Sequence, residues 1–227
     1  MAEPNEMRTY RQFSPQSEEW TSLPERWRAA LVNSASGFKP LVVIGTSNTN
    51  GINNLAVFSQ LIHIGANPPL LGVLFRPDSA ERHTLKNLRA SGRCTVNAVA
   101  DGWHRKAHQT SARYPEETSE FDAVGWPVQL RPEWPAPFAA GSPVQWAARL
   151  HSEVPLANGT HLVVLEVVEF FVDAAGIGTD GYVDLSALHV LTVNGLDAYY
   201  RTECVERLAY AKPGTEPTSL TPQPDRP

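Results

Sequence analysis

Two short segments decide the fold prediction: NNLAVFS at residues 53–59 and RHTLKNL at residues 82–88. The first has the apolar and uncharged composition of a strand, with a small side chain at Ala56 and a hydroxyl at Ser59. A flat ring can lie along such a backbone, because Asn54, Val57 and Phe58 bring no charge to it. An ordinary barrel strand explains this segment equally well, so the strand alone does not define a site.

The second segment offers positive and hydrogen-bonding side chains at the predicted start of a helix. Arg82 and His83 are basic, Thr84 and Asn87 carry a hydroxyl and an amide, and Arg76 ends the preceding strand. The N-terminus of a helix attracts anions through its free N–H groups and its dipole, and arginine adds bidentate contacts. A solvated basic helix face is the alternative explanation. Together, the two segments predict a site for a phosphorylated aromatic cofactor.

Composition limits the class of protein. The chain has 227 residues, 42% hydrophobic and 19% charged, which is typical of a globular domain that can bury a core. Its net charge of −5 disfavours a nucleic acid or an anionic membrane as the main partner. The acidic N-terminus does not resemble a signal peptide, and Cys94 and Cys204 stand apart as expected of free thiols in a reducing compartment. We therefore expect a cytoplasmic protein.

The order of predicted elements indicates a β-barrel with inserted helices. Residues 1–38 are expected to form an N-terminal helical arm, residues 39–203 the main domain, and residues 204–227 a tail that is disordered from residue 212. Because helices and strands do not alternate regularly, a doubly wound sheet is disfavoured. The predicted strands are 41–46, 52–64, 70–75, 94–99, 144–154, 160–172 and a pair within 190–201; the predicted helices are 82–90, 103–112 and 117–123, and the proline-rich residues 126–143 are expected to be irregular.

Two other patterns do not indicate sites. The glycines of 176–181 have the GxGxxG spacing, but no helix is predicted after them, so a dinucleotide fold is not supported. His104 and His108 lie one helical turn apart without further zinc ligands, which favours a solvated helix face and no metal site.

The order and spacing of several motifs resemble the flavin reductase-like family of FMN-binding split barrels across residues 39 to 201. Each piece is weak alone, and their order makes the resemblance specific. The pieces are NG at 50–51, NLAVFS at 54–59, NPPLL at 67–71, RHTLKNL at 82–88, VN at 96–97, AHQTSARYP at 107–115, SEFDAVG at 119–125, SPV at 142–144 and NGLDAYYR at 194–201.

This resemblance implies a mostly β split barrel that forms a homodimer with FMN at the subunit interface. The ring would lie along residues 56–59. The cofactor-binding residues carried over are Asn54, Ala56, Val57, Phe58, Ser59, Arg76, Arg82, His83, Thr84, Asn87 and Tyr200. Many relatives have Lys-Asp-Thr where this chain has Arg82-His83-Thr84, and the arginine keeps the positive charge.

The implied activity is an FMN-dependent oxidoreductase that uses NAD(P)H as co-substrate. His161 looks like the histidine of the Gly-Asp-His motif that lies on the nicotinamide side in some relatives, although Thr160 replaces the acid; a structural histidine at a strand start is the alternative. An FMN-binding electron carrier or flavin store without reductase turnover is the rival function.

A pyridoxamine phosphate type oxidase is disfavoured by residues 107–125. A monooxygenase or another electron acceptor is a candidate partner, and the sequence does not choose between NADH and NADPH.

Overall fold

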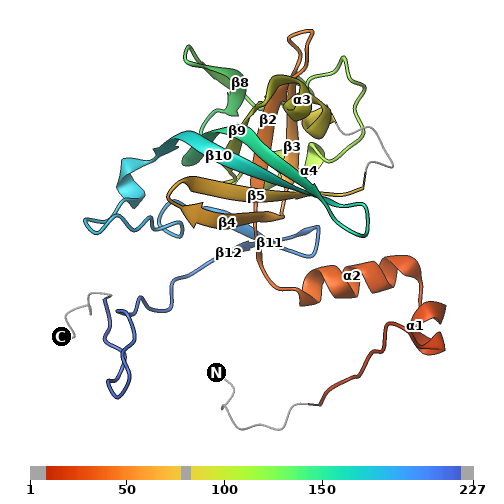
Figure 1. The fold of residues 1–227 in the computed structure, drawn as a ribbon, viewed down its shortest axis with the longest axis vertical. Helices are drawn as coiled ribbons and strands as arrows, with labels where there is room; N and C mark the ends of the chain where they lie inside the picture. Colours follow the sequence, from red (N-terminus) through yellow and green to blue (C-terminus); the bar gives the residue numbers. More distant parts are fainter. Residues whose placement is uncertain (1–8, 78–82, 221–227) are drawn as a thin grey trace.

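A computed structural model of the chain describes residues 9–77 and 83–220 (Figure 1). Its helices and strands are α1 (Glu18–Ser22), α2 (Glu25–Ala35), β1 (Lys39–Pro40), β2 (Val42–Ser47), β3 (Asn53–Phe58), β4 (Leu61–Ala66), β5 (Pro69–Phe75), α3 (His83–Ser91), β6 (Arg93–Ala98), α4 (His104–Gln109), α5 (Glu120–Ala123), β7 (Val128–Arg131), β8 (Trp134–Ala139), β9 (Val144–Pro155), β10 (His161–Val172), a short 3₁₀ helix (Ala174–Gly176), β11 (Leu191–Asn194) and β12 (Ala198–Arg201).

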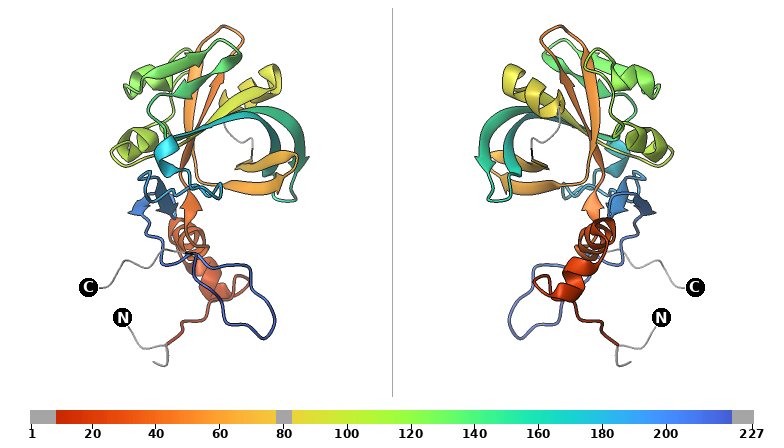
Figure 2. Two further views of the ribbon diagram at one scale, coloured as in Figure 1. Left: turned by 90° about the vertical axis from the view of Figure 1, so that its left-hand side faces the viewer. Right: turned by 90° about the vertical axis from the view of Figure 1, so that its right-hand side faces the viewer.

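The centre of the fold is an antiparallel sheet of seven strands in the order β3-β2-β6-β9-β10-β5-β4. Figure 2 shows that this sheet curls strongly, yet its edge strands β3 and β4 are not paired with each other. The barrel is therefore open, and the predicted fold class, a mostly β split barrel with inserted helices, is confirmed.

Apolar side chains fill both faces of the sheet. One cluster lies between the curled strands and α3 and includes Ile44, Val73, Leu85 and Leu88. The cluster on the other face joins the strands to α4, α5 and β11. Cys94 is fully buried, and this burial raises the pKa of its thiol to about 12, so Cys94 is a core residue with little thiolate.

The prediction of one long strand at residues 52–64 was wrong. The structure ends β3 at Phe58 and begins β4 at Leu61, so Ser59 and Gln60 form a corner between the two edges of the barrel. The two corner residues are polar, but the corner contains no glycine or proline, which is the usual sequence signal for a break.

The prediction of an irregular segment at residues 126–143 was also wrong in part, because β7 and β8 form a hairpin there. Strand β8 pairs in a ladder with β7 alone, so Pro135 and Pro137 are tolerated although they lack an N–H. The carbonyl of Pro137 accepts a hydrogen bond of 2.6 Å from the Thr95 hydroxyl, and this contact fixes the hairpin on β6.

The two ends of the described chain lie outside the barrel. Helices α1 and α2 contain no buried residue and project from the body (Figures 1 and 2). Phe13 packs against Trp20 and Trp27, with ring centroids 6.0 and 5.7 Å apart. Residues 204–220 are irregular apart from one bridge between Leu208 and Ser219. The disorder expected from residue 212 stays a prediction. In the described ranges, no helix combines the length and apolarity needed to cross a bilayer.

Candidate functional site

Strand β3 is an edge strand of the sheet, so one side of its backbone has no neighbouring strand. In an antiparallel pair, only every second residue exchanges backbone hydrogen bonds with the neighbouring strand. The Asn48 N–H donates to the Ile52 carbonyl at 3.0 Å, so the residues of β3 that bond to β2 are Asn54, Ala56 and Phe58. The N–H groups of Leu55 and Val57 consequently point away from β2. Because β3 ends the sheet, these donors lie at an open edge beside the small side chain of Ala56.

A buried polar cluster ties β2 and β3 to the start of α3. The Asn54 amide donates to the hydroxyl oxygens of Thr84 (3.0 Å) and Thr46 (3.2 Å), and the Asn87 amide donates to Thr46 (3.2 Å). All four side chains are buried. The structure thus brings together three predicted site residues, and it adds Thr46, which the sequence analysis missed. The cluster holds the first turn of α3 against the edge strand.

The basic side chains of the predicted anion site are only partly described. His83 is the first residue of α3 and is partly exposed, and Arg76 is exposed just beyond the end of β5. Arg82 lies outside the described residues. The N-terminal end of α3 therefore lies beside β3, with an imidazole and a hydroxyl in its first two residues.

The corner at residues 59–60 connects this edge with β5 and β10. The ring of Phe58 meets the ring of Phe75 edge to face, with centroids 4.9 Å apart. Phe75 lies opposite His161 in the ladder between β5 and β10. His161 thus starts the strand that pairs with β5, and its position beside the flavin stays a prediction.

His161 belongs to a charged cluster on β9, β10 and α3. Its Nδ1 lies 2.6 Å from Oε1 of Glu153, and the other oxygen of Glu153 accepts a bond of 3.0 Å from Nε of Arg89. Arg89 lowers the pKa of Glu153, against a smaller opposing effect of burial, so this carboxylate is charged at neutral pH. Glu153 orients the imidazole, as the partner of a catalytic or a structural histidine would.

Glu120 is a buried residue of this region that the sequence analysis did not select. Its side chain on α5 is 5% exposed, and its Oε2 accepts a hydrogen bond of 3.0 Å from the outward N–H of Leu55. Burial raises the pKa of the Glu120 carboxyl, and the Leu55 N–H partly offsets that effect. The sequence signal for Glu120 was its place directly before the apolar Phe121 in a short predicted helix.

Tyr200 is not brought to the β3 edge within one chain. Its side chain is 41% exposed and packs against Phe38 with ring centroids 4.9 Å apart. The preceding Tyr199 instead packs against the apolar cluster that includes Leu55 and Val57. Neighbouring residues of a strand face opposite ways, so Tyr200 points away from that cluster.

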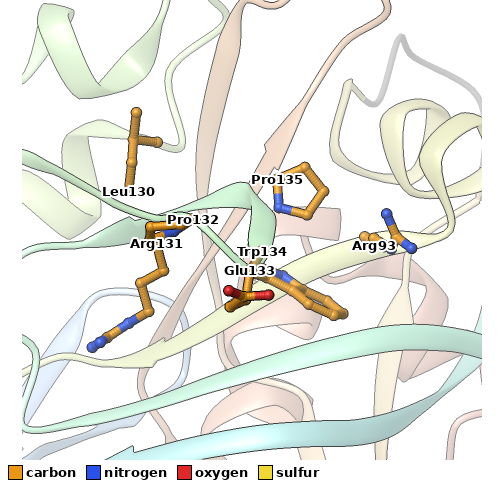
Figure 3. A pocket seen from close by; sticks show the side chains of 7 residues that line it. All are labelled: Arg93, Leu130, Arg131, Pro132, Glu133, Trp134 and Pro135. Carbon is orange, nitrogen blue, oxygen red and sulfur yellow. The ribbon is translucent and has the colours of Figure 1, made fainter.

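The other patterns of the sequence do not form competing sites. No helix follows residues 176–181 in the part of the chain that the structure describes. His108 Nδ1 lies 2.6 Å from the Tyr199 hydroxyl, and no set of metal ligands is found within residues 9–77 and 83–220. An open hollow of about 590 Å³ lies beside the β7–β8 hairpin (Figure 3), and none of its lining residues is a predicted site residue.

An open barrel whose edge strand β3 lies next to the start of α3 defines the class of the fold as a split barrel. The family model of the flavin reductase like domain matches residues 36–186. This match covers more than half of the chain, so the chain belongs to the flavin reductase-like domain family.

Similar proteins agree with this assignment. A split-barrel protein of the flavin reductase type from Shewanella frigidimarina NCIMB 400 is 41% identical, with a TM-score of 0.82 over 86% of this chain and 98% of that chain. Nitrilotriacetate monooxygenase component B from Bacillus cereus has the same fold at 18% identity, with a TM-score of 0.77 over 89% of this chain and 100% of that chain. An uncharacterized protein of Aquifex aeolicus (strain VF5) is 28% identical over 120 residues, which span 52% of this chain and 61% of that relative.

Proposed function

We propose that this protein binds FMN along the β3 edge and uses it to oxidise NAD(P)H. The observation that carries the proposal is the outward N–H of Val57 on an edge strand, beside the N-terminal end of α3. A backbone donor at an edge can bond the polar rim of a planar ring, and the partly exposed Ala56 leaves space next to it. Membership of the flavin reductase-like family supports the choice of a flavin as ligand.

The phosphate of FMN would be held at the start of α3. Arg82 and His83 supply positive charge, and Thr84 is the hydroxyl closest to the helix N-terminus. The buried bonds of Thr84 and Asn87 with their neighbours would keep this turn in place before the ligand arrives. Such preorganisation lowers the entropic cost of binding. When bound, FMN would supply hydride chemistry, accepting two electrons and one proton from the nicotinamide.

The flavin site is proposed to lie between two copies of the chain. The projecting arm supports this, because α1 and α2 bury no residue on their own barrel and Phe38 and Tyr200 are exposed beside it. An apolar surface of this kind is stabilised when a second subunit covers it. Tyr200, which points away from the cluster beside its own β3, would then reach the flavin of the partner copy.

We expect the full-length protein to be a dimer at micromolar concentration, as measured by light scattering coupled to size exclusion. A variant without residues 1–36 should lose part of the interface and dissociate at a higher concentration than the full chain. A full-length protein that stays monomeric throughout this range would contradict the dimeric site.

The reductase activity is tested by anaerobic mixing of the FMN-loaded protein with NADH or with NADPH. We expect the flavin absorbance band to bleach with at least one of the two nucleotides, with one nucleotide oxidised per flavin. A yellow protein that neither nucleotide bleaches would favour the electron carrier. If the flavin is reduced, a monooxygenase is a candidate acceptor, since a protein of this fold is a monooxygenase component.

A further inference from the structure

The Glu120 carboxyl is buried, and burying an acidic side chain costs free energy of folding. Asp and Glu are rarely buried without a partner, because an apolar environment disfavours their charge. Glu120 is nevertheless buried on a four-residue helix, and its neighbour Phe121 fills the apolar cluster beside β3. Its Oε2 contacts the backbone of the edge strand itself, through the Leu55 N–H at 3.0 Å.

This contact divides the open edge of β3 into two parts. The Leu55 N–H is occupied by Glu120, whereas the Val57 N–H points the same way two residues further along. Two residues of a strand span about 7 Å. A ring that is bonded at Val57 would therefore have the Glu120 carboxyl as its neighbour along the edge.

We propose that Glu120 is a positioning residue that closes one end of the flavin edge and makes the site hold reduced FMN less tightly than oxidised FMN. The inference rests on the proposed function. Reduced FMN carries more negative charge on its ring than oxidised FMN near neutral pH. In its ionised form, the buried Glu120 carboxyl about 7 Å away would repel that added charge, because screening by water is weak there. Weaker binding of the reduced form lowers the reduction potential of the bound flavin, so the flavin becomes a stronger reductant for its acceptor.

The test is the ratio of two dissociation constants, one for oxidised FMN and one for chemically reduced FMN under anaerobic conditions. Glu120→Gln keeps an oxygen acceptor for Leu55 and removes the charge. We expect this variant to bind reduced FMN about tenfold more tightly than the wild type, with oxidised FMN within about twofold. Glu117→Gln removes a charge from an exposed position nearby and is expected to leave both constants unchanged.

A second variant separates the charge from the hydrogen bond. Glu120→Asp keeps the charge and withdraws the acceptor, so the amide exchange of Leu55 should become faster while the ratio stays within about twofold of the wild type. This variant keeps the proposal testable if Glu120→Gln does not fold. An unchanged ratio in Glu120→Gln, or a tenfold change in Glu120→Asp, would overturn the role of Glu120. A wild-type protein that binds FMN in neither state would instead overturn the proposed function itself.

Discussion

FMN is expected to bind about a hundredfold more tightly than riboflavin, because only FMN carries the phosphate that the start of α3 would hold. Charged hydrogen bonds contribute roughly 1.5–3 kcal/mol each, so two of them at the low end of this range correspond to about this ratio. Removing one contact with Arg82→Ala should weaken FMN binding about tenfold or more and leave riboflavin binding unchanged. Fluorescence titration of the apoprotein with both flavins measures these values.

Two control variants separate phosphate binding from general effects on α3. Lys86→Ala removes a cation of the same helix whose ammonium bonds Glu116 at 2.7 Å, so it should leave FMN affinity unchanged. Thr84→Ser keeps the hydroxyl that accepts from Asn54, and it should preserve both stability and affinity. Equal affinity for FMN and riboflavin would exclude α3 as the phosphate site.

His161→Ala is expected to slow flavin reduction by NAD(P)H about tenfold while FMN affinity changes little. Groups that act in the transition state affect the rate, and groups that bind uniformly affect the affinity. Stopped-flow absorbance of the loaded protein gives the rate. Glu153→Gln is the matched variant, because it removes the charged partner of His161 and of Arg89 but keeps the imidazole.

The pair of variants distinguishes the two roles of His161. If the imidazole faces the nicotinamide, His161→Ala should be slower than Glu153→Gln. Rates at the wild-type level in His161→Ala would leave this histidine as a structural residue of the cluster with Glu153 and Arg89.

The sequence predicted those parts of the fold that local patterns determine. Strands with continuous apolar runs were located within about two residues, as in β2 (Val42–Ser47), since their burial is encoded in consecutive residues. The corner at Ser59 and Gln60 was missed because it arises from the curl of the whole sheet. The β7–β8 hairpin was missed because its prolines lie in a strand with only one ladder partner, which no local pattern reveals.

The site was predictable to a similar extent. Asn54, Thr84 and Asn87 were selected as cofactor residues, and the structure brings them together at the start of α3 through Thr46. Their contact depends on residues that are 30 and 41 positions apart, so spacing alone does not reveal it. Glu120 was missed for the same reason, because its partner Leu55 is 65 residues away.

The central claim is that FMN lies on the β3 edge with its phosphate at the start of α3. Amide hydrogen exchange of the full-length protein, with and without FMN, tests this claim most directly. We predict slower exchange in two segments, residues 54–59 and 83–87, with the Val57 amide among the most protected. Unchanged exchange in both segments, together with protection at the hollow lined by residues 130–135, would contradict the claim and move the ligand to the β7–β8 hairpin (Figure 3).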